Sequence, residues 1–77
     1  MIIKEFINID NKKVKKLKLK KINSNNNDFI EICKLCNYSN LDILIFFNDF
    51  DLYENENYEN HFYIARNIRN KEYYIWN

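Results

Sequence analysis

Apolar and polar residues alternate along much of this chain, and the alternation predicts strands near its beginning. Met1–Ile9 carries isoleucine on both parities, which predicts a strand with both faces partly covered. Asp10–Lys12 predicts a turn. Val14–Ile22 predicts a second strand, in which Leu17 and Leu19 face the core and the intervening lysines face solvent. The two end residues of this segment have the opposite parity, so we expect a bulge or an early end in the strand.

One helix is predicted in the middle of the chain, after the polar loop Asn23–Asn27. Asp28 occupies an N-cap position and Glu31 lies three residues later, which is the capping-box spacing. Asn37–Asn40 predicts the end of the helix, because Asn tolerates the left-handed conformation of a helix C-terminus. The apolar stripe of this helix has the spacing i, i+3, i+4 and i+7 and consists of Phe29, Ile32, Cys33 and Cys36.

The C-terminal half predicts three more strands. Leu41–Phe47 has almost no polar alternation, which is typical of a central, buried strand. Asn48–Asn60 is acidic and predicts a solvated loop. His61–Arg66 and Lys71–Asn77 are rich in aromatic residues and predict a hairpin closed by Asn67–Asn70.

The predicted element order is β-β-α-β-β-β within a single domain over residues 1–77. This order indicates an α+β fold, with one mostly antiparallel or mixed sheet packed on one helix. A hairpin, a helix that crosses the sheet and further strands resembles the layout of β-grasp, or ubiquitin-like, domains. A chain of 77 residues has room for one small core and little room for a deep catalytic cleft.

The composition of the chain excludes several classes of site. Gly and Pro are absent, which excludes the phosphate-binding P-loop, the dinucleotide fingerprint and the calcium-binding EF-hand. Asn occurs 15 times, Ile 12 times and Lys 10 times, and these amino acids have A/T-rich codons. We therefore expect an A/T-rich source genome, as in many phages, viruses, mobile elements and low-GC bacteria.

The distribution of apolar residues and cysteines predicts a cytoplasmic protein. Lys4 and Glu5 interrupt the N-terminal apolar run, which is unlike a secretory signal peptide. The longest apolar run, Ile43–Phe47, is far too short to span a bilayer. Two cysteines without a secretory signal favour a reducing compartment.

Cys33 and Cys36 have the spacing of a zinc-binding or redox pair. A structural zinc site needs four ligands, and the one histidine of the chain is His61, far along the sequence. Both cysteines lie on the apolar stripe of the predicted helix, which favours core packing. Cys36 with His61 would form a nucleophile and base only if the fold joined them, and no oxyanion loop is recognisable. We therefore predict no enzyme activity, no cofactor and no metal.

The charges of the chain are strongly separated along the sequence. Seven lysines lie within residues 12–21, and residues 1–38 carry a net charge of +5 whereas residues 39–77 carry −4. A lysine-lined strand could bind the phosphates of a nucleic acid, contact an acidic protein, or protect a sheet edge from aggregation. The candidate nucleic-acid-binding residues are Lys13, Lys16, Lys18 and Lys20.

Aromatic and acidic residues predict a protein-binding surface in the C-terminal half. Tyr and Trp are common anchors of protein interfaces, and charges around them orient docking. The aromatics could instead pack on both faces of a small sheet, and the acids could belong to a solvated loop. The candidate partner-binding residues are Tyr63, Tyr74, Trp76, Arg66, Arg69, Asp49, Asp51, Glu54 and Glu56.

These features favour a small non-enzymatic inhibitor or adaptor that binds a host protein or nucleoprotein complex. In size and simplicity the chain is similar to anti-defence proteins of phages, including anti-CRISPR inhibitors. Two alternatives stay open: a nucleic-acid-binding module that uses the lysine-rich strand, and a structural subunit of a larger assembly. The oligomeric state and the identity of the partner are left open.

Overall fold

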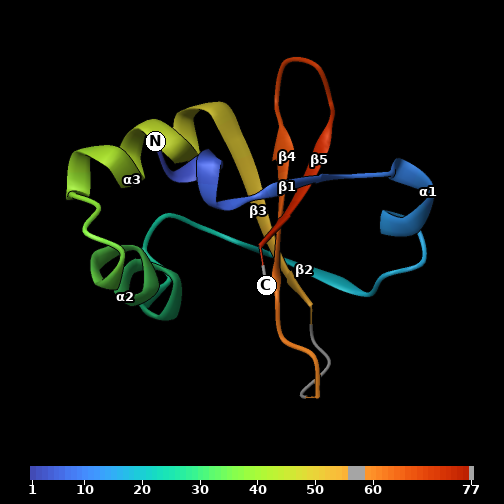
Figure 1. The fold of residues 1–77 in the computed structure, drawn as a ribbon, viewed down its shortest axis with the longest axis horizontal. Helices are drawn as coiled ribbons and strands as arrows, with labels where there is room; N and C mark the ends of the chain where they lie inside the picture. The colour runs from blue at the N-terminus through green and yellow to red at the C-terminus, as the bar shows by residue number, and fades with distance from the viewer. Residues whose placement is uncertain (56–58, 77) are drawn as a thin grey trace.

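The computed structural model describes residues 1–55 and 59–76, which form an antiparallel sheet with helices on both faces (Figure 1). Within these residues the sheet has five strands in the order β1-β5-β4-β3-β2, and every neighbouring pair is antiparallel. Helices α2 and α3 lie on one face, here called the helix face, and α1 lies on the opposite face. The elements are the 3-10 helix η1 (Ile2–Glu5), β1 (Ile7–Ile9), α1 (Asn11–Val14), β2 (Leu19–Ile22), α2 (Asn27–Leu35), α3 (Asn40–Asp49), β3 (Phe50–Asn55), β4 (Tyr63–Asn67) and β5 (Tyr73–Trp76).

The N-terminal segment is only partly the predicted strand. η1 occupies its first residues, and β1 is a three-residue edge strand paired with β5. Ile2 and Phe6 are buried whereas Ile7 is exposed. A continuous strand would also place Ile2 and Phe6 on one face. The helical turn is instead defined by its hydrogen bonds, in which the Lys4 backbone N–H donates to the Met1 carbonyl at 3.2 Å and the Phe6 backbone N–H donates to the Ile3 carbonyl at 2.9 Å. The apolar residues on both parities therefore reflect a change of secondary structure.

The second predicted strand begins five residues late. Asp10 caps the one-turn helix α1 by accepting a hydrogen bond of 2.9 Å from the Lys12 backbone N–H. Val14 is the last residue of this helix and is buried against the sheet. It does not belong to the strand, so it need not follow the alternation of Leu17 and Leu19. Leu17 and Leu19 pack on the same cluster as expected. β2 is an edge strand of the sheet.

Helix α2 is confirmed, but its cap is Asn26 rather than Asp28. The Asn26 side chain accepts a hydrogen bond of 3.0 Å from the Phe29 backbone N–H, and Asp28 lies in the first turn. An acid in the first turn is stabilised by the helix dipole. Asn37 has a φ of 67°, as expected for a left-handed residue after the helix. At the C-terminus of α2, the Tyr38 backbone N–H donates a hydrogen bond of 3.0 Å to the Cys33 carbonyl.

The predicted central strand Leu41–Phe47 is wrong, because these residues belong to helix α3. Ser39 and Asp42 form a capping box: the Ser39 backbone N–H donates to the Asp42 carboxylate at 2.8 Å, and the Asp42 backbone N–H donates to the Ser39 hydroxyl at 3.2 Å. The inner strand between β2 and β4 is β3, which lies within the segment predicted as an acidic loop. Residues 56–58 of that predicted loop, including Glu56, lie outside the described residues.

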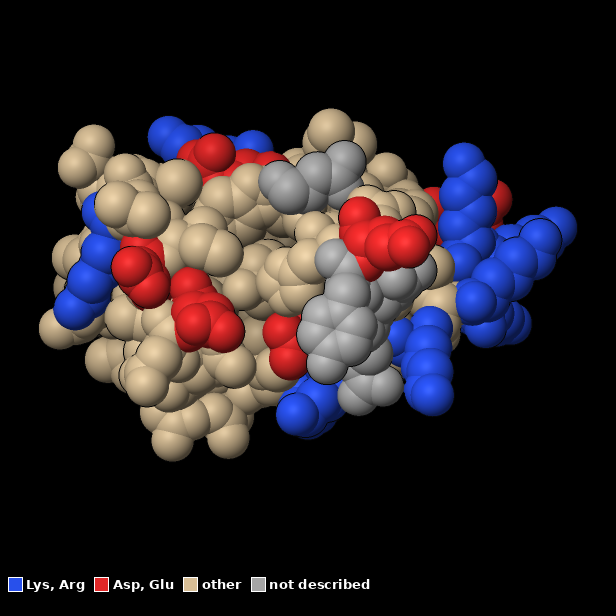
Figure 2. Space-filling model, turned by 90° about the horizontal axis from the view of Figure 1, so that it is seen from below, with Lys and Arg blue, Asp and Glu red and all other residues tan. Residues whose placement is uncertain are grey.

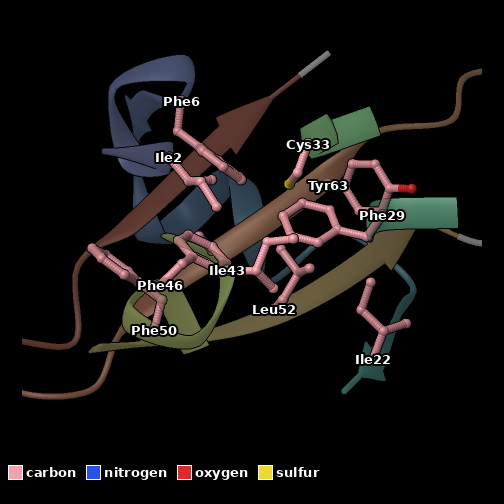
Figure 3. Close-up of a cluster of buried hydrophobic side chains, with 11 residues drawn as sticks. Ile2, Phe6, Ile22, Phe29, Cys33, Ile43, Phe46, Phe50, Leu52 and Tyr63 are labelled. Carbon is pink, nitrogen blue, oxygen red and sulfur yellow. The ribbon is translucent and has the colours of Figure 1, made fainter. Parts of the chain in front are cut away.

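The C-terminal hairpin is confirmed, and its strands β4 and β5 each begin two residues later than predicted. Its side chains alternate between two clusters: Tyr63 and Ala65 belong to the helix face, and Phe62 and Ile64 belong to the opposite face. Phe29 lies in the middle of the helix-face cluster, with ring centroids 5.6 Å from Phe46 and 5.1 Å from Tyr63 (Figure 3). Both faces of β4 are thus covered.

The α+β fold class is confirmed, with two longer helices rather than one packed on the helix face. The β-grasp layout is not confirmed, since the described sheet is antiparallel throughout and has the order β1-β5-β4-β3-β2. None of the described helices combines the length and the hydropathy needed to cross a membrane.

Candidate functional site

Helix α3 carries large aliphatic side chains on the side that faces away from the core. Leu41 is 64% exposed, Leu44 62% and Ile45 46%, and the spacing i, i+3, i+4 places them on one face of the helix. The opposite side of α3 buries Ile43 and Phe46. A helix that is apolar on all sides is usually buried on all sides, so the face formed by Leu41, Leu44 and Ile45, here called the exposed α3 surface, lacks a cover.

Two hollows border the exposed α3 surface. A narrow one of about 40 Å³ lies between α3 and the N-terminal segment and is lined by Ile45 together with Met1 and Ile3. A wider one of about 490 Å³ lies beyond it, where Met1 and Ile3 meet the β4–β5 hairpin at Ile68 and Arg69. Met1 and Ile68 are themselves exposed. The apolar surface therefore continues from α3 across the N-terminal segment to the hairpin.

Two carboxylates flank the exposed α3 surface on one side. Asp42 and Asp49 both line the narrow hollow beside Ile45. Hydrogen bonds from the Ser39 backbone and side chain lower the pKa of Asp42, so this carboxylate is ionised at neutral pH. Because the two residues are seven apart on one helix, they lie about 10 Å apart along its axis. The surface is thus apolar with an acidic border.

The predicted aromatic anchors lie largely within the core. Tyr63 is only 4% exposed, and burial raises its pKa to about 12. Trp76 and Tyr74 are half-buried on the helix face, where their rings lie 5.4 Å from Phe6 and 6.0 Å from Phe50 respectively. Two-sided packing of the sheet, the alternative that the sequence left open, therefore accounts for all three aromatics.

Most of the predicted charged residues already have partners within the fold. Asp51 pairs with Lys21 at 3.5 Å, and Glu54 lies 3.2 Å from the His61 ring. Arg66 stacks over the Tyr73 ring at 5.7 Å. Two other predicted residues, Asp49 and Arg69, are brought together along the wider hollow that borders the exposed α3 surface.

The predicted nucleic-acid-binding lysines are exposed at the end of the molecule that carries α1. Lys13, Lys16, Lys18 and Lys20 all lie on the surface, and Figure 2 shows lysines and arginines gathered at that end. Of these four residues only Lys20 belongs to β2, the edge strand. Protection of a sheet edge therefore explains only a small part of this lysine cluster.

The cysteines and the histidine do not come together as a metal site. Cys33 is fully buried, and burial, with a smaller effect of Cys36, raises its pKa to about 12. Cys36 is exposed, and His61 lies against Glu54 and the Tyr63 ring. Among residues 1–55 and 59–76, no group of three or more His, Cys, Asp or Glu side chains is arranged to hold a metal ion.

The exposed α3 surface was missed because its residues were predicted to form a buried strand. The signal that could have revealed it is the Ser39-x-x-Asp42 capping box directly before the apolar run. Read as a helix, the run has more apolar residues than one buried face can hold, so some of them must face outward.

Comparison with protein-family models, curated proteins and solved structures finds no match for this chain.

Proposed function

We propose that this protein binds a partner protein through the exposed α3 surface. The observation that supports the proposal is the cluster of Leu41, Leu44 and Ile45, which are between 46% and 64% exposed on one side of a helix. Contiguous exposed apolar side chains mark interaction sites in soluble domains. Covering the exposed part of each aliphatic side chain would stabilise a complex by on the order of 1 kcal/mol.

The partner that fits this surface has an apolar row bordered by lysine or arginine. Helix α3 contains two acids, Asp42 and Asp49, and no basic residue, and both acids lie on the same side of the apolar face. In an antiparallel pairing of two copies of α3, the acids of both helices would lie on the same side and repel each other. This charge pattern favours a different protein over a second copy of the chain.

A small domain of this kind would act as an adaptor or inhibitor by covering a functional surface of its partner. The proposed binding uses no catalytic residue. Three further points are predictions from the composition. The A/T-rich codon preference supports an origin in a phage or other mobile element, and with it a role as an inhibitor of a host complex. The reduced cysteines support a cytoplasmic location.

The test compares a double variant on the exposed α3 surface with a control substitution at an exposed leucine on another helix. The tagged full-length chain, its double variant Leu41→Ser with Leu44→Ser, and the control Leu35→Ser on α2, whose side chain is 77% exposed, are used to capture proteins from nuclease-treated lysate. The captured protein is then purified, and its affinity for each variant is measured by calorimetry. We expect the double variant to bind about 100-fold more weakly than the wild type, or about tenfold for each leucine.

Two results would contradict the proposal. Equal affinity of the double variant and the wild type would show that the partner binds elsewhere. A dimer in light scattering that the double variant converts to a monomer would show that a second copy covers α3. If the proposal holds, Asp49→Asn weakens binding and reduces its salt dependence, because a basic border of the partner loses its counter-charge.

A further inference from the structure

A second surface lies at the other end of the molecule, on the face of the sheet opposite α2 and α3. It is built around residues 12–21, here called the lysine segment, whose seven lysines are all exposed. Val14, Leu17 and Leu19 fasten this segment to the sheet by packing with Phe62 and Ile64. Apolar anchors between the lysines therefore hold the backbone of this segment against the sheet, while the lysine side chains project into solvent (Figure 2).

The position of the lysines argues against a role limited to protecting the sheet edge. Only Lys20 and Lys21 belong to the edge strand β2, and Lys21 is paired with Asp51 at 3.5 Å. Lys12 and Lys13 lie on α1, and the others lie in the connection to β2. An exposed charge on a helical turn or a connection does not block strand pairing, so most of the cluster needs another explanation.

Aromatic rings and a guanidinium group lie on the same face of the sheet as the lysine segment. Tyr53 and Tyr73 are half-buried and pack on the cluster that holds Val14. The Arg66 guanidinium lies over the Tyr73 ring at 5.7 Å, and its Nε is buried without a hydrogen-bond partner among the described residues. Arg66 is directly opposite Tyr73 in the pairing of β4 with β5. This face thus combines basic groups with partly exposed π-surfaces.

We propose that this face binds single-stranded nucleic acid. The lysines would contact successive phosphates as point charges, and unpaired bases would stack on Tyr53 and on the stacked pair of Arg66 and Tyr73. An acidic protein would satisfy the lysines but would leave the aromatic faces without a matching group. A duplex would offer phosphates but keep its bases paired, so a single strand uses more of this surface.

The test measures fluorescence anisotropy of a labelled 12-nucleotide poly-dT strand with the full-length protein across a salt series. Each lysine–phosphate contact contributes about −0.7 to the slope of log affinity against log salt for a single strand. We expect the triple variant Lys13→Glu, Lys16→Glu and Lys18→Glu to flatten the slope by about 2. A control with two lysine-to-glutamate changes elsewhere, Lys4→Glu on η1 and Lys34→Glu on α2, should keep the wild-type slope.

The stacking residues are tested separately from the charges. Tyr73→Leu keeps an apolar side chain in the cluster, and circular dichroism checks that the variant is folded. We expect it to bind poly-dT about tenfold more weakly with an unchanged salt slope, since stacking on one ring contributes about 1–3 kcal/mol per base.

Three results would overturn the inference. The first is that poly-dT does not bind at low salt. The second is that the Lys4→Glu/Lys34→Glu control flattens the salt slope as much as the triple variant does. The third is that polyglutamate displaces labelled poly-dT as efficiently as unlabelled poly-dT does, which would indicate an acidic protein as the partner. Leu41→Ser with Leu44→Ser should bind poly-dT like the wild type, so a failure here and a failure of the proposed protein interface are distinguishable.

Discussion

The hydroxyl group of Tyr38 donates a hydrogen bond of 2.5 Å to the carboxylate of Glu5, 33 residues earlier in the chain. Tyr38 lies in the short link between α2 and α3, and Glu5 ends η1. The bond therefore joins the N-terminal segment to the helical layer. It helps to hold η1 against α3, beside the exposed α3 surface.

Tyr38→Phe should lower the free energy of unfolding by about 1 kcal/mol, because the Glu5 carboxylate loses its donor. Urea denaturation followed by circular dichroism measures the change. An unchanged free energy of unfolding in Tyr38→Phe would contradict a role for this hydroxyl in joining distant segments.

Ile43→Val and Ile45→Val test which side of α3 faces the core. The two residues have the same side chain, but Ile43 is 4% exposed and Ile45 46%. Removing one buried methylene typically costs about 0.5–1.5 kcal/mol of stability, so we expect this loss for Ile43→Val and a change within about 0.5 kcal/mol for Ile45→Val. Chemical denaturation of the isolated chain measures both. A buried strand at Leu41–Phe47, as the sequence predicted, would place Ile43 and Ile45 on the same face and give similar losses.

Lys71→Gly should stabilise the protein, because Lys71 has a φ of 66°, in the left-handed region. Glycine removes the strain of a Cβ atom in this conformation. The greater freedom of glycine in the unfolded chain offsets part of that effect, so the free energy of unfolding should rise by about 0.5–1 kcal/mol. For a domain of this size, that gain corresponds to a rise of several degrees in Tm. Asn37→Gly is the matched variant at a φ of 67°, and we expect almost no change there since Asn tolerates this conformation. A lower Tm for Lys71→Gly would contradict the prediction.

Stability should fall as pH rises above about 9. Burial is the largest cause that raises the pKa of Cys33, Tyr38 and Tyr63, each to about 12, from ordinary values of 9.0 for the thiol and 10.0 for the phenols. The folded chain therefore keeps protons that the unfolded chain releases, so the stabilisation is complete below pH 9 and is lost as pH rises toward 12. Urea denaturation at a series of pH values measures the decline. Constant stability across this range would contradict it, and Tyr38→Phe should make the decline shallower.

The local pattern was sufficient for some elements of this fold. Strict alternation along the first strand of the C-terminal hairpin places Phe62 with Ile64 on one face and Tyr63 with Ala65 on the other, as in the structure, since successive side chains of a strand point to opposite sides. The left-handed Asn37 was predictable for a similar reason, because in a chain without glycine few other residues tolerate that conformation. These features depend on backbone geometry within a few residues.

The candidate protein-binding site was harder to predict because it depends on which elements become neighbours. A short apolar run such as Leu41–Phe47 is compatible with a buried strand or with a helix, and periodicity alone does not separate them. The Ser39 capping box favours the helix, but the position of Phe50–Asn55 as an inner strand depends on its pairing with both β2 and β4. Assigning Leu41–Phe47 to a buried strand left no reason to expect Leu41 and Leu44 at the surface, where the structure has them.

The sequence by itself determined the α+β class, the aromatic hairpin, the end of α2 and the exposure of the lysines, because each follows from side-chain periodicity, left-handed tolerance or the cost of burying charge. Only the tertiary structure decided which apolar residues are left at the surface. Helix α3 can turn one side toward the sheet, and the packing of Phe46 and Ile43 against Phe29 and its neighbours fixes that side. Leu41, Leu44 and Ile45 are exposed because that inner space is already filled.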